Sequence, residues 1–190
     1  MKIRARLAFI LVLAGLGLTG CSSNEVPGGS SPVVLSLGEN VLYPDNEPPS
    51  IRLKKGDRTE VVSGADDYPS RPAISPNGTK MAYIAPYEFE LAGDVWLYET
   101  GSGEKRKRID RDAFGADRAA WKVVWADDER LLVLVGDRYG TVTLNREIFA
   151  YDLSSGQSQS ILIAGVNQDI RELAVQDSRI SFRIATYNVS

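Results

Sequence analysis

Residues 71–109 of the 190-residue chain, RPAISPNGTKMAYIAPYEFELAGDVWLYETGSGEKRKRI, determine its architecture. Four segments of this stretch are predicted to be short β-strands: Arg71–Ser75, Lys80–Ala85, Asp94–Glu99 and Lys105–Ile109. The second segment is apolar, and the third is rich in the β-branched and aromatic residues that favour strands. The fourth is polar, as expected of a strand at the edge of a sheet.

The connections between these segments have the composition of turns. Ser75-Pro76-Asn77-Gly78-Thr79 joins the first two, and Asn and Gly readily adopt positive φ values. Tyr87–Gly93 forms a longer loop, and Thr100-Gly101-Ser102-Gly103-Glu104 forms a second turn. The stretch is therefore predicted to fold as a four-stranded antiparallel meander.

The same unit occurs a second time. Ala126-Asp127-Asp128-Glu129-Arg130 takes the place of the first turn, 50 positions after Pro76, and Glu147–Asp152 takes the place of the third strand. Gly156 takes the place of Gly103, 53 positions later. Four-stranded units repeated at about 40–50 residues are typical of the blades of a β-propeller.

The residues also resemble a known repeat. Ala73–Tyr83, AISPNGTKMAY, is similar to the repeat signature of TolB-like, WD40-like β-propellers, and Asp94-Val95-Trp96-Leu97-Tyr98 resembles its second half. The second unit departs from the pattern, because it has Trp125-Ala126-Asp127-Asp128 where the family has Ser-Pro-Asp-Gly. The resemblance implies a blade type and no particular activity, since such propellers serve as scaffolds, as peptidase caps and in some enzymes.

Three and a half blades are predicted, with approximate ranges 33–64, 70–110, 119–163 and an incomplete 170–190. Closed propellers need roughly four to eight blades. We therefore predict an all-β, partial or truncated propeller. Its open sheet edges make self-association with a second chain an alternative way of closing the ring.

The first 20 residues are predicted to be a signal peptide outside the fold. They combine a basic start with an apolar run, Leu7–Leu18, that is too short to span a bilayer as a helix. Leu18-Thr19-Gly20-Cys21 resembles the bacterial lipobox, which implies cleavage between Gly20 and Cys21 and acylation of Cys21. The polar segment 21–32 is predicted to be a tether to the membrane lipid, and the domain occupies 33–190.

Composition excludes several functions. The chain has no histidine and a single cysteine, so His-based triads, His-ligated metals and internal disulfides are absent. Without the three basic residues of the leader, 19 of the 22 Lys and Arg residues remain against 25 Asp and Glu, so we expect no nucleic-acid partner. No cofactor motif occurs, and none is predicted.

Acidic and aromatic residues allow alternatives. Asp127-Asp128-Glu129 could bind calcium, but it lacks the alternating spacing of an oxygen cage. Asp110 and Asp112 with Asp117 are better spaced for a metal, but they lack the D-x-D-x-D-G order and the closing Glu. Solvated or capped turns are therefore preferred, and no metal is predicted. Trp96 is predicted to pack between blades. Trp121 and Trp125, four residues apart on one strand, are predicted to share a face. Trp121 could instead reach the propeller mouth.

The preferred function is a membrane-anchored envelope lipoprotein whose non-catalytic propeller presents loops to another envelope protein or to a wall component. Loops on a rigid scaffold are the expected binding surface. The alternative is the propeller portion of an envelope peptidase or polysaccharide-acting enzyme whose catalytic part lies elsewhere. A third interpretation, a degenerate fragment without a stable fold, also agrees with the sequence.

Overall fold

The computed structural model describes residues 33–35, 41–43, 49–139 and 145–187. The predicted leader, Gly20, Cys21 and the tether lie outside the described residues. No helix within these ranges is long and apolar enough to cross a membrane.

The described chain consists of fourteen strands and two short 3-10 helices, η1 (Ala65–Asp67) and η2 (Arg111–Phe114). The strands are β1 (Val33–Leu35), β2 (Val41–Tyr43), β3 (Ile51–Lys55), β4 (Arg58–Ser63), β5 (Ala73–Ile74), β6 (Lys80–Ala85), β7 (Asp94–Glu99), β8 (Lys105–Ile109), β9 (Arg118–Trp125), β10 (Arg130–Asp137), β11 (Glu147–Asp152), β12 (Ser158–Ile163), β13 (Gln168–Gln176) and β14 (Arg179–Thr186).

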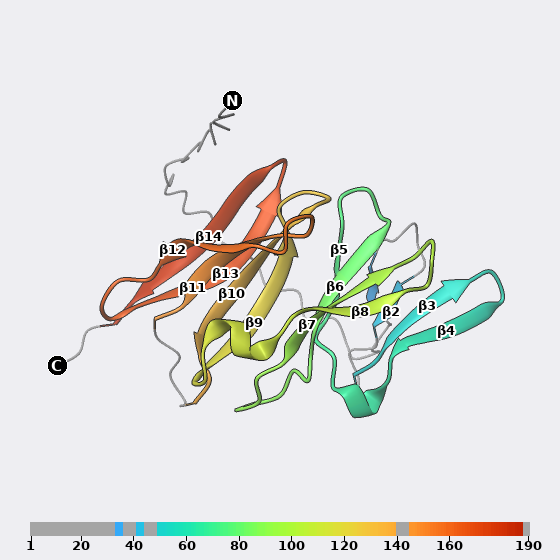
Figure 1. Cartoon of the computed structure of the whole chain (residues 1–190), viewed down its shortest axis with the longest axis horizontal. Helices are drawn as coiled ribbons and strands as arrows, with labels where there is room; N and C mark the ends of the chain where they lie inside the picture. The colour runs from blue at the N-terminus through green and yellow to red at the C-terminus, as the bar shows by residue number, and fades with distance from the viewer. Residues whose placement is uncertain (1–32, 36–40, 44–48, 140–144, 188–190) are drawn as a thin grey trace, which may run out of the picture.

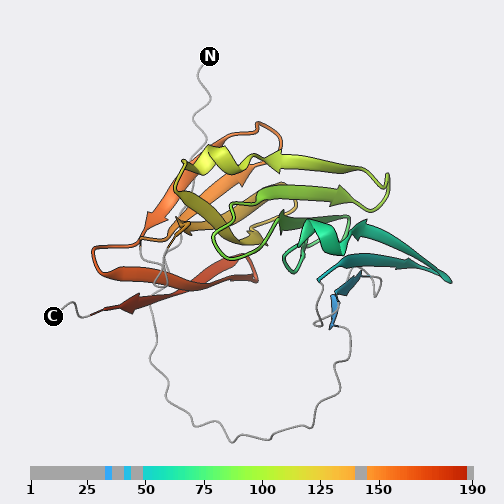
Figure 2. The same ribbon diagram turned by 90° about the horizontal axis from the view of Figure 1, so that it is seen from below.

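Consecutive strands pair antiparallel in four separate sheets. We call them blade 1 (β1–β4), blade 2 (β5–β8), blade 3 (β9–β12) and half-blade 4 (β13–β14). They follow one another across the molecule from right to left in Figure 1, and Figure 2 shows them face to face. The predicted all-β, partial propeller is confirmed, and the described sheets do not close into a ring.

One predicted strand is shorter than expected. The sequence predicts a strand over residues 71–75, but β5 covers only Ala73–Ile74. Pro72 and Pro76 flank β5, and a proline has no N–H to donate to a neighbouring strand. Regular pairing with β6 is therefore short, although the Ser75 amide still donates to the Lys80 carbonyl at 2.9 Å.

The core lies between the blades, because alternate residues of each strand point to opposite faces of its sheet. In β6, Ala82 and Ile84 face blade 3, whereas Met81 and Tyr83 face blade 1. All four side chains are at most 1% exposed. The central strand of a blade thus contributes to two neighbouring cores at once.

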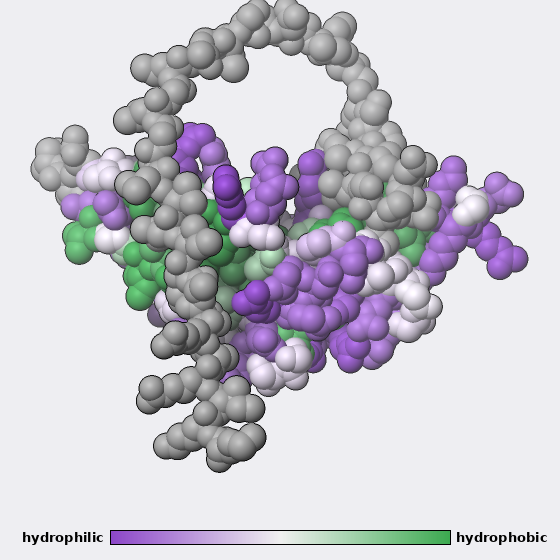
Figure 3. All heavy atoms as spheres, turned by 90° about the horizontal axis from the view of Figure 1, so that it is seen from above, coloured by the Kyte–Doolittle hydropathy of each residue, from purple (hydrophilic) through white to green (hydrophobic). Residues whose placement is uncertain are grey.

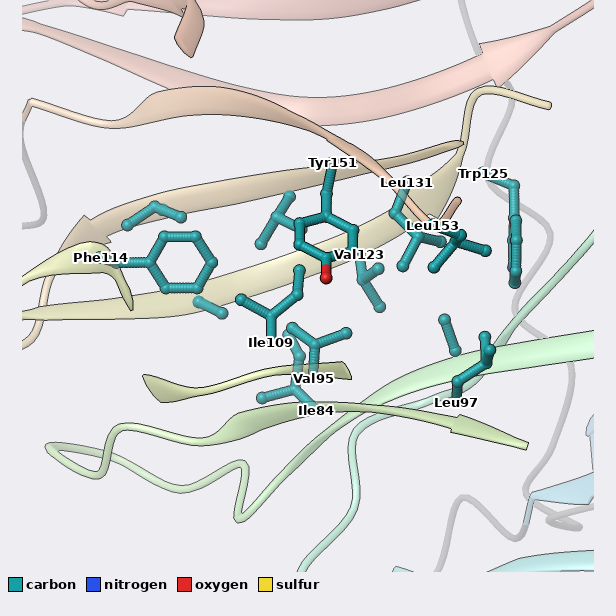
Figure 4. Close-up of a cluster of buried hydrophobic side chains, with 14 residues drawn as sticks. Ile84, Val95, Leu97, Ile109, Phe114, Val123, Trp125, Leu131, Tyr151 and Leu153 are labelled. Carbon is teal, nitrogen blue, oxygen red and sulfur yellow. The ribbon is translucent and has the colours of Figure 1, made fainter. Parts of the chain in front are cut away.

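The largest core joins blades 2 and 3 (Figure 4). Ile84 and Val95 point toward Tyr151 and Val123 of the facing sheet. Fully burying one aliphatic side chain contributes about 1.5–3 kcal/mol, so this interface is a principal source of stability. A second cluster joins blades 1 and 2, and a third joins blade 3 to half-blade 4.

Candidate functional site

A hollow of about 650 Å³ opens between the first strands of blades 2 and 3 and half-blade 4. These are β5, β9 and β13, and each is the end strand of its sheet. The lining residues come from these strands and the turns that follow them: Ala73, Ile74, Pro76, Lys122, Val124, Trp125, Ala126, Asp127, Asp128, Leu173, Ala174, Val175, Asp177 and Ser178.

The hollow is apolar on its strands and acidic at its turns. Ile74, Val124 and Val175 are half-buried, so part of each apolar surface remains accessible. Three carboxylates, those of Asp127, Asp128 and Asp177, lie on the turns, and Lys122 is the one cation among the lining residues. A partner segment that carries an apolar side chain and a positive charge would complement this surface.

The acidic side of the hollow is held by hydrogen bonds. Asp127 accepts hydrogen bonds from the Glu129 amide (3.0 Å) and from Nε of Arg130 (2.7 Å). Partial burial acts to raise the pKa of Asp127, but these hydrogen bonds and the Arg130 charge outweigh it, and the pKa lies below its ordinary value. Asp127 is therefore ionised at neutral pH, and its charge is paired with that of Arg130.

The two repeated turns contact each other directly. The Asn77 amide donates to Oδ1 of Asp128 at 2.9 Å, and Nζ of Lys80 contacts Oε1 of Glu129 at 2.6 Å. These contacts join blade 2 to blade 3 at the mouth of the hollow. The acidic triplet 127–129 thus acts as a link between blades, and the described residues contain no group of three His, Cys, Asp or Glu side chains placed to hold a metal ion.

The residues of the blade motif support these turns. Oδ1 of Asn77 accepts hydrogen bonds from the Ser75 hydroxyl (2.9 Å) and from the Thr79 amide (3.0 Å). The Glu129 amide makes the equivalent bond to Asp127, so an aspartate replaces Asn77 in the second unit. Pro76, which belongs to the same turn as Asn77, lines the hollow.

Three glycines of the motif have positive φ values, which glycine tolerates without steric cost. Gly78 has φ 72°, and Gly103 and Gly156 have φ 72° and 70° in the equivalent turns before the fourth strands of blades 2 and 3. Their near-identical backbone supports the alignment of the two units. Of the three, Gly78 belongs to a turn beside the hollow.

Asp94 and Trp96 lie away from the hollow. Asp94 is 4% exposed and accepts hydrogen bonds from the amide and the guanidinium of Arg111, at 2.8 and 3.1–3.2 Å, so it holds the linker between blades 2 and 3. Trp96 packs against the cluster between blades 1 and 2. Both side chains therefore hold parts of the fold together: Asp94 bonds the linker, and Trp96 packs between blades.

The prediction that Trp121 and Trp125 share a face is wrong. Trp125 belongs to the core between blades 2 and 3, and its Nε1 donates to the Ala73 carbonyl at 2.9 Å. Trp121 packs against the cluster on the other face of blade 3. The pairing of β9 with β10 skips Trp121, and this β-bulge inserts one extra residue that reverses the alternation.

A buried ion pair that the sequence did not reveal joins blade 3 to half-blade 4. The carboxylate of Asp169 is 1% exposed and contacts Nη1 of Arg146 at 3.3 Å and Nε of Arg171 at 3.2 Å. The Arg146 guanidinium also lies 5.1 Å from the ring centroid of Trp121. No motif marks these residues, because the contact joins positions 23 residues apart on separate sheets.

Comparison with solved structures supports the fold. A conserved protein of Clostridium novyi NT that is assigned as a lipoprotein is 17% identical to this chain. The TM-score is 0.57, and the match covers 73% of this chain and 84% of that one. A protein of Agrobacterium tumefaciens that is assigned as TolB is 9% identical, with a TM-score of 0.51. The match covers 68% of this chain and 47% of that one. A prolyl endopeptidase structure is 14% identical with a TM-score of 0.51, and only 25% of its chain is covered.

These identities establish a shared propeller architecture and no shared activity. The chain spans about half the length of the TolB structure and most of the Clostridium protein. No family model matches the sequence, and no curated protein matches it.

Proposed function

We propose that this protein is an envelope lipoprotein, anchored through acylated Cys21, whose propeller sector binds another envelope protein without catalysing a reaction. The hollow between β5, β9 and β13 carries the proposal, because it combines accessible apolar surface on its strands with carboxylates on its turns. The lipobox-like sequence before Cys21 supports the location.

The chemistry of the hollow indicates what the partner presents. Half-buried Ile74 and Val124 offer contact to an aliphatic or aromatic side chain. Asp128 and Asp177 offer charge to a Lys, an Arg or an amino terminus, whereas Asp127 is already paired with Arg130. We therefore expect a protein segment with an apolar anchor next to a basic group.

Site-specific photo-cross-linking in intact cells tests this function. A photoreactive residue at Ala174, which is exposed and lines the hollow, should yield a discrete adduct with a second protein. The same residue at exposed Lys54 on blade 1 is the matched control, because Lys54 does not line the hollow. Equal adducts at both positions, or none at Ala174, would contradict binding in the hollow.

The anchor is tested separately. Labelling with a fatty-acid analogue should mark the wild-type chain, and Cys21→Ala should remove the label and release the chain from the membrane fraction. A labelled Cys21→Ala chain would show that the lipid lies elsewhere.

A further inference from the structure

The last described strand, β14, differs from the equivalent second strands of the other blades. In β6 every residue after the first is buried, and in β10 six of eight residues are buried. In β14 no residue is buried, and Ile180, Phe182 and Ile184 are 44%, 39% and 43% exposed. A strand with core composition thus lies at the surface.

These three side chains share one face of half-blade 4. Ile180 is paired with Val175 and Ile184 with Ile170, and paired residues of antiparallel strands point to the same side. Ile170 is fully buried against blade 3, so the face is the one that continues the core. Apolar colour appears at the left end of the molecule in Figure 3, where Figure 1 places β12 to β14.

β14 also has a free edge within the described residues. It pairs with β13 on one side, and no described strand pairs with the other. The outer strand of blade 2, β8, blunts its edge with Lys105–Arg108, which protects against edge pairing. β14 has eight residues with a continuous apolar stripe and no comparable run of charge.

We propose that β14 pairs antiparallel with β14 of a second copy of this chain, across a two-fold axis at Phe182. The sequence of the strand, RISFRIAT, supports this register because the stripe is symmetric about its centre. Phe182 then faces its own equivalent, and Ile180 faces Ile184 of the second copy. The two half-blades become one four-stranded sheet with a shared apolar face.

Charge selects this register over its neighbours. A two-fold axis at Arg183 places two arginines directly opposite each other, and an axis at Ser181 places Arg179 opposite Arg183 of the second copy. The axis at Phe182 instead opposes Ser181 to Arg183 and Arg179 to Ala185. Like charges directly opposite each other destabilise a sheet, so the central register is favoured.

Cysteine cross-linking of the full chain in its own cells tests the register. Phe182→Cys places two thiols opposite each other, within the reach of a disulfide. On mild oxidation, Phe182→Cys should give a reducible dimer. This dimer should be several-fold more abundant than the dimer formed by Ile180→Cys or by Ile184→Cys alone. Both single variants should cross-link only weakly, and the Ile180→Cys/Ile184→Cys double variant should link strongly.

Two controls measure random collision. The wild-type chain reports any contribution of Cys21, and Val61→Cys places a thiol at a position that is 59% exposed on blade 1. Phe182→Cys that links no more than Val61→Cys would overturn the proposal. Ile180→Cys that links as strongly as Phe182→Cys would overturn the register.

A second measurement does not depend on introduced thiols. The purified full-length wild-type chain should sediment as a dimer, and Ser181→Arg should shift it toward monomer, because it opposes the new arginine to Arg183 on both sides of the axis. Ser158→Arg serves as the charge control, because Ser158 is exposed on β12, away from the proposed β14 edge. A wild-type chain that stays monomeric at all attainable concentrations would overturn the pairing, as would an adduct at this edge with a different protein.

Discussion

Replacing Leu131 by alanine should destabilise the protein strongly, because this side chain belongs to the core between blades 2 and 3 and is 0% exposed. Truncating a buried leucine to alanine costs about 2–5 kcal/mol, which combines lost burial with the cavity left behind. A typical domain has only about 5–15 kcal/mol of stability in total. At roughly 3 kcal/mol, the melting temperature of a chain of this size would fall by about 6–12 °C.

Leu91→Ala provides the matched control, because Leu91 is 41% exposed in the loop after β6. The same atoms are removed there without leaving a closed cavity, so the loss should stay below about 1 kcal/mol. Urea unfolding followed by tryptophan fluorescence measures both variants. Equal losses for Leu131→Ala and Leu91→Ala would refute the stacking of blades 2 and 3.

Two further predictions concern single interactions. Trp125→Phe removes the donor to the Ala73 carbonyl and should cost about 1–3 kcal/mol of unfolding free energy, because the acceptor loses its partner; a change near zero in urea unfolding would show that this bond does not link the blades. Hydrogen bonds from the Ser154 hydroxyl and the Ser155 amide lower the pKa of Asp152 to about 2, so their stabilisation is present above the unfolded-state pKa near 4 and is lost as the pH falls toward 2. Asp152→Asn should therefore flatten the decline of the melting temperature between about pH 4 and 2, and an unchanged slope would exclude this carboxylate as a contributor.

The repeated strands could be predicted from the sequence because local signals agree there. Strands 80–85 and 94–99 follow from apolar and aromatic composition, and the positive φ values at Gly78 and Gly103 follow from turn chemistry. The substitution of Asp127 for Asn77 preserves the same side-chain bond, so the second unit keeps its turn despite the changed sequence. Local chemistry was therefore enough to predict the strands and turns within the two repeated blades.

The site could not be predicted to the same extent, because it depends on contacts between blades. The bulge at Trp121 leaves no sequence mark, yet it decides which core each tryptophan of β9 joins. The Arg146–Asp169 pair and the hollow both require the relative position of separate sheets. Periodicity describes which face a residue has within one strand and does not describe which neighbouring strand that face meets.

The contacts that position the hollow and the residues that line it are only partly the same. Trp125 and Asp128 belong to both groups, since they line the hollow and also bond to Ala73 and Asn77 of the preceding blade. Lys122 and Ala174 line it as exposed residues, so their substitution should change the surface without the cost of opening a core. The fold can therefore hold the shape of the hollow constant while its exposed lining changes, which is the property that a partner-specific docking surface on a common scaffold requires.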